Sequence, residues 1–432
     1  MGLADVRQIS EKAVFTSPAF QPVLPLMDGN KSVDEIVGAV GNGLTRTPLE
    51  YLIGQLDDAG LLFGPTYEGL VTKLHADFDG SEVLPPATTA AFADALAEHT
   101  VRMERPEAER EKPVELTDAE REQIGVRRLR EVFNGWIDES LKQDANPSLD
   151  MLPKGIVVPH LDYQRGWMNY ASVWGRLRVV DRPDRVIILG TNHFGEGTGV
   201  VGCNKGYQSP LGTCEADAKF IETLSANLGP EKAKKLFANR YDHEREHSIE
   251  LQIPWIQHVL GKDESGNFPT VFGALVHDPS VNNGESYDGE GLSLSDFVTA
   301  LRATIGSMPG KTLLVASADL SHVGLAFGDK CGVAQVDPAR EGGEEHNKQA
   351  ETFRNQTFQH DRDMLQLVAE GKIDQLIASM AWQQNPTRWC SIGNLSALFN
   401  TLEPKTVRVY NYAAAVDEQT QSMVSSVGMS LD

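Results

Sequence analysis

Short apolar runs alternate with longer helical patterns in the second part of the chain, and this alternation constrains the fold more than any other feature. The runs GIVV at 155–158 and VIIL at 186–189 are too short and too β-branched for helices, and turn-forming residues follow each. Between them lies a helical pattern, YQRGWMNYASVWGRL. Strands that alternate with helices form a largely parallel sheet between helix layers. We therefore predict a three-layer α/β domain over residues 152–432, with mixed or antiparallel edge strands near the C-terminus.

A histidine follows each of these two runs: His160 in GIVVPHLDY and His193 in VIILGTNHF. Residues at the carboxyl ends of strands in an α/β fold face the ligand-binding crevice. A single loop histidine is more often satisfied by backbone hydrogen bonds than used as a ligand. Two histidines at matching positions after two strands favour a shared metal site.

Two further motifs offer candidate site residues. In SADLSH, Asp319 and His322 follow the apolar strand LLVA, where they could orient one another or a ligand. The alternative is a capped turn, which we favour for Ser321. Cys390 in TRWCSIGN precedes an apolar helical pattern, and a thiolate there is either a nucleophile or a soft metal ligand. The alternative for Cys390 is an ordinary core thiol.

The stretch HEREH at 243–247 matches the HExxH signature of zinc proteases. A zinc-protease helix needs an apolar face through the motif, whereas NRYDHEREHS is almost wholly polar and the apolar run begins only at Ile249. We therefore predict that His243 lies in a loop and that a helix opens at His247. A zinc-dependent hydrolase remains a minor alternative.

The first third of the chain has a different character. Residues 1–70 are predicted to form a small domain with a helix capped by Ser32, a second helix ended by Gly60 and a strand at 61–63. Residues 71–151 are predicted to be a helical and charged linker that contains RMERPEAEREKPVE and a helix opened by a capping box at Thr117.

Charge and hydropathy restrict the partners and the compartment. The chain has 39 basic and 61 acidic residues and a formal net charge of −22, which disfavours nucleic acid and anionic membranes as partners. No run approaches the roughly 20 apolar residues of a membrane span. The N-terminus lacks the basic start and apolar stretch of a signal peptide, so we expect a cytoplasmic protein. The four cysteines are widely spaced, which predicts neither a disulfide framework nor a zinc knuckle.

Six motifs in a fixed order carry a family resemblance: PHLDY, ILGTNHFG, SPLGTCEAD, EHSIELQIPW, SADLSH and WCSIGN. In this order they resemble the Memo family. That family resembles the class III extradiol dioxygenases, whose LigB-like α/β fold holds non-haem iron(II) through two histidines and a glutamate. Memo proteins carry a cysteine where the dioxygenases have the glutamate. The resemblance implies that His160, His193 and Cys390 are metal ligands and that His247 lines the same pocket.

The resemblance also implies a chemistry. We expect iron(II), with copper or zinc as alternatives, and an oxidoreductase in which His247 is the general acid or base and Asp319 or His322 orients the substrate. A non-catalytic metal- or peptide-binding protein is the alternative. This chain departs from the usual PHAGY-type motif by Asp162, which could be an extra ligand or a base behind the ligands, and from the usual Cys-Gly by Cys390-Ser391.

A second resemblance concerns residues 15–64. The elements LMDG, SVDEIV and LIGQLDDAGLL resemble the PqqD-like winged-helix domain, a peptide-recognition element found beside many peptide-modifying enzymes. This resemblance implies a peptide-borne substrate as the alternative to a small molecule. The genomic neighbourhood typical of bacterial Memo proteins implies a radical-SAM protein as a functional partner.

Overall fold

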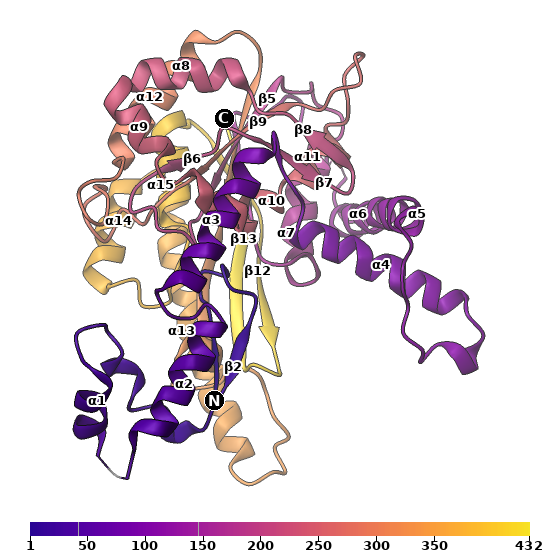
Figure 1. Ribbon diagram of the computed structural model, residues 1–432. Helices are drawn as coiled ribbons and strands as arrows, with labels where there is room; N and C mark the ends of the chain where they lie inside the picture. Colours follow the sequence, from indigo (N-terminus) through magenta and orange to yellow (C-terminus); the bar gives the residue numbers. More distant parts are fainter. Residues whose placement is uncertain (42, 146) are drawn as a thin grey trace. The chain divides into compact units, whose positions relative to one another are not determined.

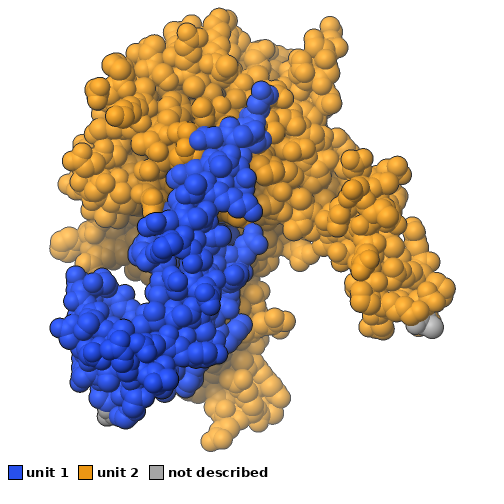
Figure 2. Space-filling model, viewed as in Figure 1, with its two compact units in different colours: residues 1–82, 193–195 blue, residues 83–192, 196–432 orange. Residues whose placement is uncertain are grey.

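The computed structural model describes residues 1–41, 43–145 and 147–432. The chain forms two compact units, residues 1–82 with 193–195 and residues 83–192 with 196–432 (Figure 2). Within the described ranges, no helix has both the length and the apolar character needed to cross a membrane.

The first unit combines a two-stranded antiparallel sheet with three helices (Figure 1). Its elements are β1 (Gly2–Ala4), β2 (Ala13–Phe15), the 3-10 turns at Pro18–Phe20 and Leu24–Leu26, and helices α1 (Val33–Val40), α2 (Arg46–Asp58) and α3 (Pro65–Gly80). The predicted cap at Ser32 is confirmed: its hydroxyl accepts a hydrogen bond from the Glu35 amide, and the Glu35 carboxylate accepts one from the Ser32 amide at 2.8 Å. This reciprocal pair satisfies two amide donors at the start of α1.

The predicted strand at 61–63 is wrong. Gly60 has φ of +69°, and the three residues after it form a turn that leads into α3. Pro65 occupies the first turn of α3, where its fixed φ and missing amide hydrogen favour a helix. Phe63 is 91% exposed. An apolar triplet becomes a strand only if a partner strand is beside it, and β1 and β2 pair with each other instead.

The second unit contains a large mixed sheet in the order β11-β13-β4-β10-β5-β9-β6, with β12 paired to β13 (Figure 1). The central strands β4, β10, β5 and β9 are parallel, as predicted. The C-terminal strands β12 and β13 are antiparallel, as predicted, but β13 lies inside the sheet between β11 and β4 and is not an edge strand. Strand β11 pairs antiparallel with β13. A smaller sheet has the order β3-β7-β8. The strands are β3 (Val83–Leu84), β4 (Gly155–Val158), β5 (Arg185–Gly190), β6 (Val201–Gly202), β7 (Gly206–Ser209), β8 (Gly212–Cys214), β9 (Thr270–Leu275), β10 (Thr312–Ser317), β11 (Asp319–Gly324), β12 (Val407–Asp417) and β13 (Ser422–Leu431).

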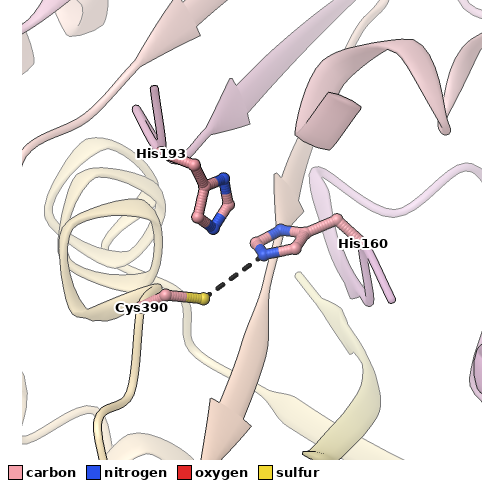
Figure 3. Close-up of side chains that lie close together, drawn as sticks. All are labelled: His160, His193 and Cys390. Atoms are coloured by element: carbon pink, nitrogen blue, oxygen red, sulfur yellow. Dashed lines mark hydrogen bonds between the residues drawn. The ribbon is translucent and has the colours of Figure 1, made fainter. Parts of the chain in front are cut away.

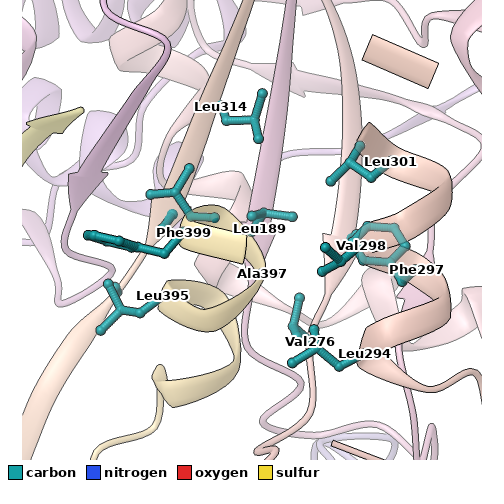
Figure 4. Close-up of a cluster of buried hydrophobic side chains, with 14 of the residues drawn as sticks. Leu189, Val276, Leu294, Phe297, Val298, Leu301, Leu314, Leu395, Ala397 and Phe399 are labelled. Carbon is teal, nitrogen blue, oxygen red and sulfur yellow. The ribbon is translucent and has the colours of Figure 1, made fainter. Parts of the chain in front are cut away.

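Helices cover both faces of this sheet. Val427 and Met429 of β13 join the main hydrophobic core, which includes side chains of α8, α12 and α15. Figure 4 shows residues of α12 and α15 in this core, among them Phe297 and Leu395. Gly428 between them faces the other way, where a Cβ atom would meet Val173 of α7 at 2.7 Å. The α/β prediction is therefore confirmed. The helices are α4 (Thr88–Glu104), α5 (Asp118–Glu120), α6 (Val126–Leu141), α7 (Tyr163–Trp174), α8 (Ala218–Leu228), α9 (Pro230–Phe237), α10 (His247–Glu250), α11 (Ile253–Val259), α12 (Leu294–Ser307), α13 (Gly343–Ala369), α14 (Ile373–Gln383) and α15 (Ile392–Leu402).

Helices α4 and α6 belong to the second unit. Phe133 of α6 stacks on Trp255 of α11, with ring centroids 4.0 Å apart. The buried Glu250 carboxylate accepts hydrogen bonds from the Thr89 amide at 2.8 Å and the Thr89 hydroxyl at 2.7 Å, at the start of α4. A carboxylate at a helix N-terminus is favoured by the orphan amides and the helix dipole. The capping box at Thr117 is confirmed at α5.

Candidate metal centre

The structure brings His160, His193 and Cys390 together at the carboxyl ends of the parallel strands. His160 follows β4, His193 follows β5, and Cys390 stands just before α15. One ligand atom from each lies within 4.8 Å of the other two. Figure 3 shows both imidazole rings and the sulfur pointing toward one another. These three side chains were the ligands expected from the sequence.

Hydrogen bonds fix the ring of His160, which is buried. Its Nδ1 lies 3.0 Å from the Ser317 carbonyl oxygen, and its amide donates to the Asp319 carboxylate at 3.1 Å. A carbonyl oxygen only accepts, so Nδ1 carries the proton of the neutral ring and the lone pair is on Nε2. Nε2 lies 3.3 Å from the Cys390 sulfur. In metal-binding histidines, one ring nitrogen typically donates its proton to a carbonyl or carboxylate oxygen, and the other, unprotonated nitrogen faces the metal. The ring of His160 has this arrangement.

Hydroxyl groups contact both the carbonyl oxygen and the sulfur of Cys390. Its carbonyl oxygen accepts a hydrogen bond from the Thr191 hydroxyl at 3.1 Å, which ties the start of α15 to the end of β5. Its sulfur lies 3.3 Å from the Ser391 hydroxyl, the residue that replaces the usual glycine. Ser391 therefore adds a polar group beside the thiol.

The loop after β5 is anchored by Asp242, which the sequence analysis did not single out. The Asp242 carboxylate accepts hydrogen bonds from the Asn192 side chain and the Gly197 amide, each at 2.8 Å. These bonds hold residues on both sides of His193. In the sequence Asp242 is only one carboxylate in a polar stretch, so its role depends on a contact that the sequence does not display.

A second group of potential ligands shares His193. It consists of His193, Glu246 and His247, whose ligand atoms also lie within 4.8 Å of one another. Glu246 is buried, its carboxylate accepts from the Ser248 amide at 2.8 Å, and it lies 3.3 Å from His247 Nδ1. The ring of His247 meets that of His160 edge to face at 5.6 Å. The sequence analysis missed Glu246, although its place as the N-cap of α10 was an available signal.

The HEREH stretch is not one helix. His243 lies in a 3-10 turn at Arg240–Glu244, and α10 begins at His247, as predicted. His243 is buried, with Nδ1 2.8 Å from the Tyr207 hydroxyl and Nε2 3.1 Å from the Val201 carbonyl oxygen. Burial lowers the pKa of His243 to about 4. Both ring nitrogens are engaged in the core, so the motif gives no support to a zinc-protease site.

Comparison with known proteins supports the motif-based resemblance. The family model described as Memo-like protein matches residues 128–430. The chain belongs to the Memo-like protein family. It is 33% identical to a MEMO1 family protein of Pyrobaculum arsenaticum over 132 residues, covering 29% of this chain and 45% of the relative. It is 32% identical to a MEMO1 family protein of Thermotoga maritima over 173 residues, which cover 39% of this chain and 54% of the relative. It is 28% identical to a MEMO1 family protein of Desulfurococcus amylolyticus over 199 residues, which cover 45% of this chain and 63% of the relative.

This Memo-like chain spans about half the length of the curated relatives that it matches. The family match begins at residue 128 and does not include residues 1–82 of the first unit. The PqqD-like resemblance therefore stays a prediction.

Two other candidate residues of this Memo-like chain lie outside both groups of potential ligands. His322 lies in β11, with Nδ1 2.9 Å from the Leu320 carbonyl oxygen. Asp162 caps α7, accepts from the Arg165 amide at 3.1 Å and is ion-paired with Arg165. A capping carboxylate paired with a cation has a structural role, which accounts for Asp162 without a ligand role.

The SADLSH segment also differs from its predicted local structure. Its residues 319–322 are in strand β11, and no helix begins there, so the capped turn favoured for Ser321 is wrong. The Ser321 hydroxyl instead donates to the Asp361 carboxylate at 2.5 Å. Asp319 is buried. Besides accepting the amide bond given above, its carboxylate lies 3.6 Å from His160 Nε2, and its carbonyl oxygen lies 3.8 Å from the Cys390 sulfur.

The remaining cysteines, Cys203, Cys214 and Cys331, belong to neither group of potential ligands among the described residues. Cys203 and Cys214 are free, buried thiols, and burial raises their pKa values to about 11 and about 12. Such thiols are inert at neutral pH.

Proposed function

We propose that this Memo-like protein binds one transition-metal ion through His160, His193 and Cys390 and acts as a metal-dependent oxidoreductase on a small or peptide-borne substrate. The observation that carries the proposal is the convergence of two imidazoles and a thiol within 4.8 Å. Two neutral imidazoles and one thiolate suit iron(II) or copper, and zinc also binds such a set. The proton on His160 Nδ1 fits this use, because it leaves the lone pair on the nitrogen that faces Cys390.

A redox-active ion bound there would supply electron transfer and a binding position for substrate. The chain's own residues have separate tasks. Ser317 keeps His160 in the ligating tautomer, and Asp319 holds the backbone of His160. His247 is the general acid or base: its Nδ1 faces the buried Glu246 carboxylate, which stabilises the ring when it gains a proton at Nε2.

Metal stoichiometry tests the ligand set. We expect protein purified without oxygen and loaded with iron(II) or copper to hold about one ion, and the His160→Ala plus His193→Ala double variant to hold none. Cys390→Ser should weaken binding by about 10-fold or more, since a hydroxyl is a poor ligand for these ions. Cys331→Ser and His346→Ala are matched controls, because neither residue belongs to a ligand group. Stoichiometric metal in the double variant would reject the site.

Oxygen consumption separates the enzyme from the non-catalytic alternative. Metal-loaded protein should consume oxygen only when a catechol or peptide substrate is added. Uptake without substrate would reflect oxidation of the thiol or the metal. Stable metal binding without uptake for any substrate class would favour a metal- or peptide-binding partner protein.

A peptide-borne substrate has support from the first unit. This unit contains a cavity of about 740 Å³ lined mainly by apolar side chains, among them Leu24, Met27, Ile36 and Phe63. Cavities with this lining and size suit apolar side chains of a peptide. In our proposal this unit delivers the peptide, and a radical-SAM protein acts on the same substrate. Phe63→Glu should abolish peptide binding by the full chain, whereas Tyr51→Glu, also exposed but outside the cavity, should not.

A further inference from the structure

A cavity of about 200 Å³ lies within the second unit, beside Cys390. Its walls come from the ends of β5 and β9 and from the residues before α15, and they include Thr191, Asn192, Val276, His277, Asp278 and Cys390. Ligands of α/β proteins bind at this edge of the sheet. At roughly 30 Å³ for each water molecule, the cavity has room for about seven.

His277 supplies a buried acceptor. The residue is 3% exposed, and its Nε2 lies 3.2 Å from the Gly284 carbonyl oxygen, so Nε2 carries the proton. Burial lowers the pKa of His277, which keeps the ring neutral. Nδ1 is then an acceptor, and among the described residues it has no hydrogen-bond partner. Buried polar atoms in native proteins are nearly always paired, so a donor from the cavity contents is expected at Nδ1.

The surroundings of His277 are fixed and acidic. Gly393 of α15 lies so close that a Cβ atom would come within 2.2 Å of the His277 carbonyl oxygen, which ties this strand end to the helix that follows Cys390. Tyr287 packs edge to face on the His277 ring at 5.6 Å, and its hydroxyl accepts from the Asp278 amide at 2.8 Å. Asp278 also lines the wall, and its carboxylate accepts a hydrogen bond from the Ser280 amide at 2.8 Å, which leaves acceptor capacity on the second oxygen. A neutral acceptor and a carboxylate favour a donor-bearing cation and disfavour an anion.

We propose that this cavity is a subsite for a primary amine, whose N–H groups bond to His277 Nδ1 and whose charge is balanced by Asp278. The subsite goes beyond the proposed metal function and needs no metal. It places the amino end of a ligand against Cys390. An amine of about four to six non-hydrogen atoms fits the available volume.

Protection of Cys390 tests the subsite in the unmodified, metal-free full chain. The probes are propylamine, propan-1-ol and propionate at equal pH and ionic strength, and the readout is alkylation of each cysteine by iodoacetamide, followed by peptide mass spectrometry. Propylamine should slow alkylation of Cys390 and leave that of Cys331, which lies outside the cavity, unchanged. Propan-1-ol should protect less, and propionate should not protect. Equal protection by propionate, equal slowing of Cys331, or no protection by propylamine would each overturn the proposal.

Two variants assign the roles. His277→Leu should weaken protection by propylamine and by propan-1-ol about two- to tenfold, the worth of one neutral hydrogen bond. Asp278→Asn should weaken protection by propylamine alone. Thermal unfolding checks that each variant folds, and if His277→Leu does not, Asp278→Asn carries the test. Undiminished protection in the folded variants would overturn the subsite. Metal stoichiometry is measured separately, so a failed metal site and a failed subsite give different results.

Discussion

Asp361 of α13 is a buried carboxylate. Its replacement should lower the folding stability and weaken the anchoring of the residue that precedes Cys390. Four side chains donate to it: Trp389 Nε1 at 2.8 Å, Tyr412 at 2.6 Å, and Ser321 and Ser425 at 2.5 Å each. Trp389 immediately precedes Cys390. In Asp361→Asn the amide nitrogen cannot accept, so about two of the four bonds are lost. Hydrogen bonds to a charged group contribute about 1.5–3 kcal/mol each, and relief of the buried charge offsets part of this, so we expect a loss of about 2–4 kcal/mol.

The assay compares Asp361→Asn with Asp363→Asn, an exposed carboxylate on the same helix that accepts only from Gln359 in the described structure. Asp363→Asn should stay within about 0.5 kcal/mol of the parent in urea unfolding followed by tryptophan fluorescence. Asp361→Asn should also alkylate faster at Cys390, because its neighbour Trp389 loses an anchor. Equal stability and equal Cys390 reactivity in the two variants would refute the reasoning.

Three further predictions concern the core around the site. The folded state holds the pKa of His243 at about 4 against an ordinary 6.5, so the unfolded chain protonates first. This residue should therefore lower the stability by up to about 3 kcal/mol as pH drops from 6.5 to 4, and His243→Gln should remove that part of the slope in pH-dependent unfolding. His258, whose pKa burial also lowers to about 4, should supply a further part that remains in the variant. Gly190→Ala would place a Cβ atom 2.5 Å from the Ser248 hydroxyl, so we expect a destabilisation of about 1–3 kcal/mol and weaker metal binding in a titration. An unchanged free energy of unfolding and an unchanged metal affinity would contradict this packing argument. Glu250→Ala leaves amides at the start of α4 unsatisfied and should cost about 2–3 kcal/mol, seen as earlier proteolysis of residues 83–141.

The fold and the two histidines were predictable from local patterns. The runs before His160 and His193 are apolar on both faces, which only a buried parallel strand explains, and the carboxyl end of such a strand is a ligand position. The spacing of the residues could not predict that Cys390 lies beside the two histidines, since 230 residues separate it from His160. Its place in the site came from the order of the motifs.

The residues that sequence reasoning missed have their effect through contacts between distant loops. Asp242 anchors residues on either side of His193, and Glu246 comes within 4.8 Å of the ligand atom of His193, which lies on a separate loop after β5. In the sequence Asp242 is one carboxylate among others, and for Glu246 the one available signal was its place before the helix that opens at His247. The strand wrongly predicted at 61–63 failed for a related reason: a strand depends on a partner, which a local pattern does not reveal.

One hydrogen-bonded path joins the elements that carry the candidate ligands. The Ser317 carbonyl oxygen accepts from His160 Nδ1 at 3.0 Å and from the buried Asn394 amide at 2.6 Å. The same amide donates to the Thr191 hydroxyl at 3.0 Å, and that hydroxyl donates to the Cys390 carbonyl at 3.1 Å. Among the described residues, Asn394 is the side chain that bonds both to the carbonyl oxygen that fixes the His160 tautomer and to the hydroxyl that holds Cys390. The WCSIGN motif therefore supplies a candidate ligand and, four residues later, an amide that is hydrogen-bonded to the groups that hold this candidate ligand and His160.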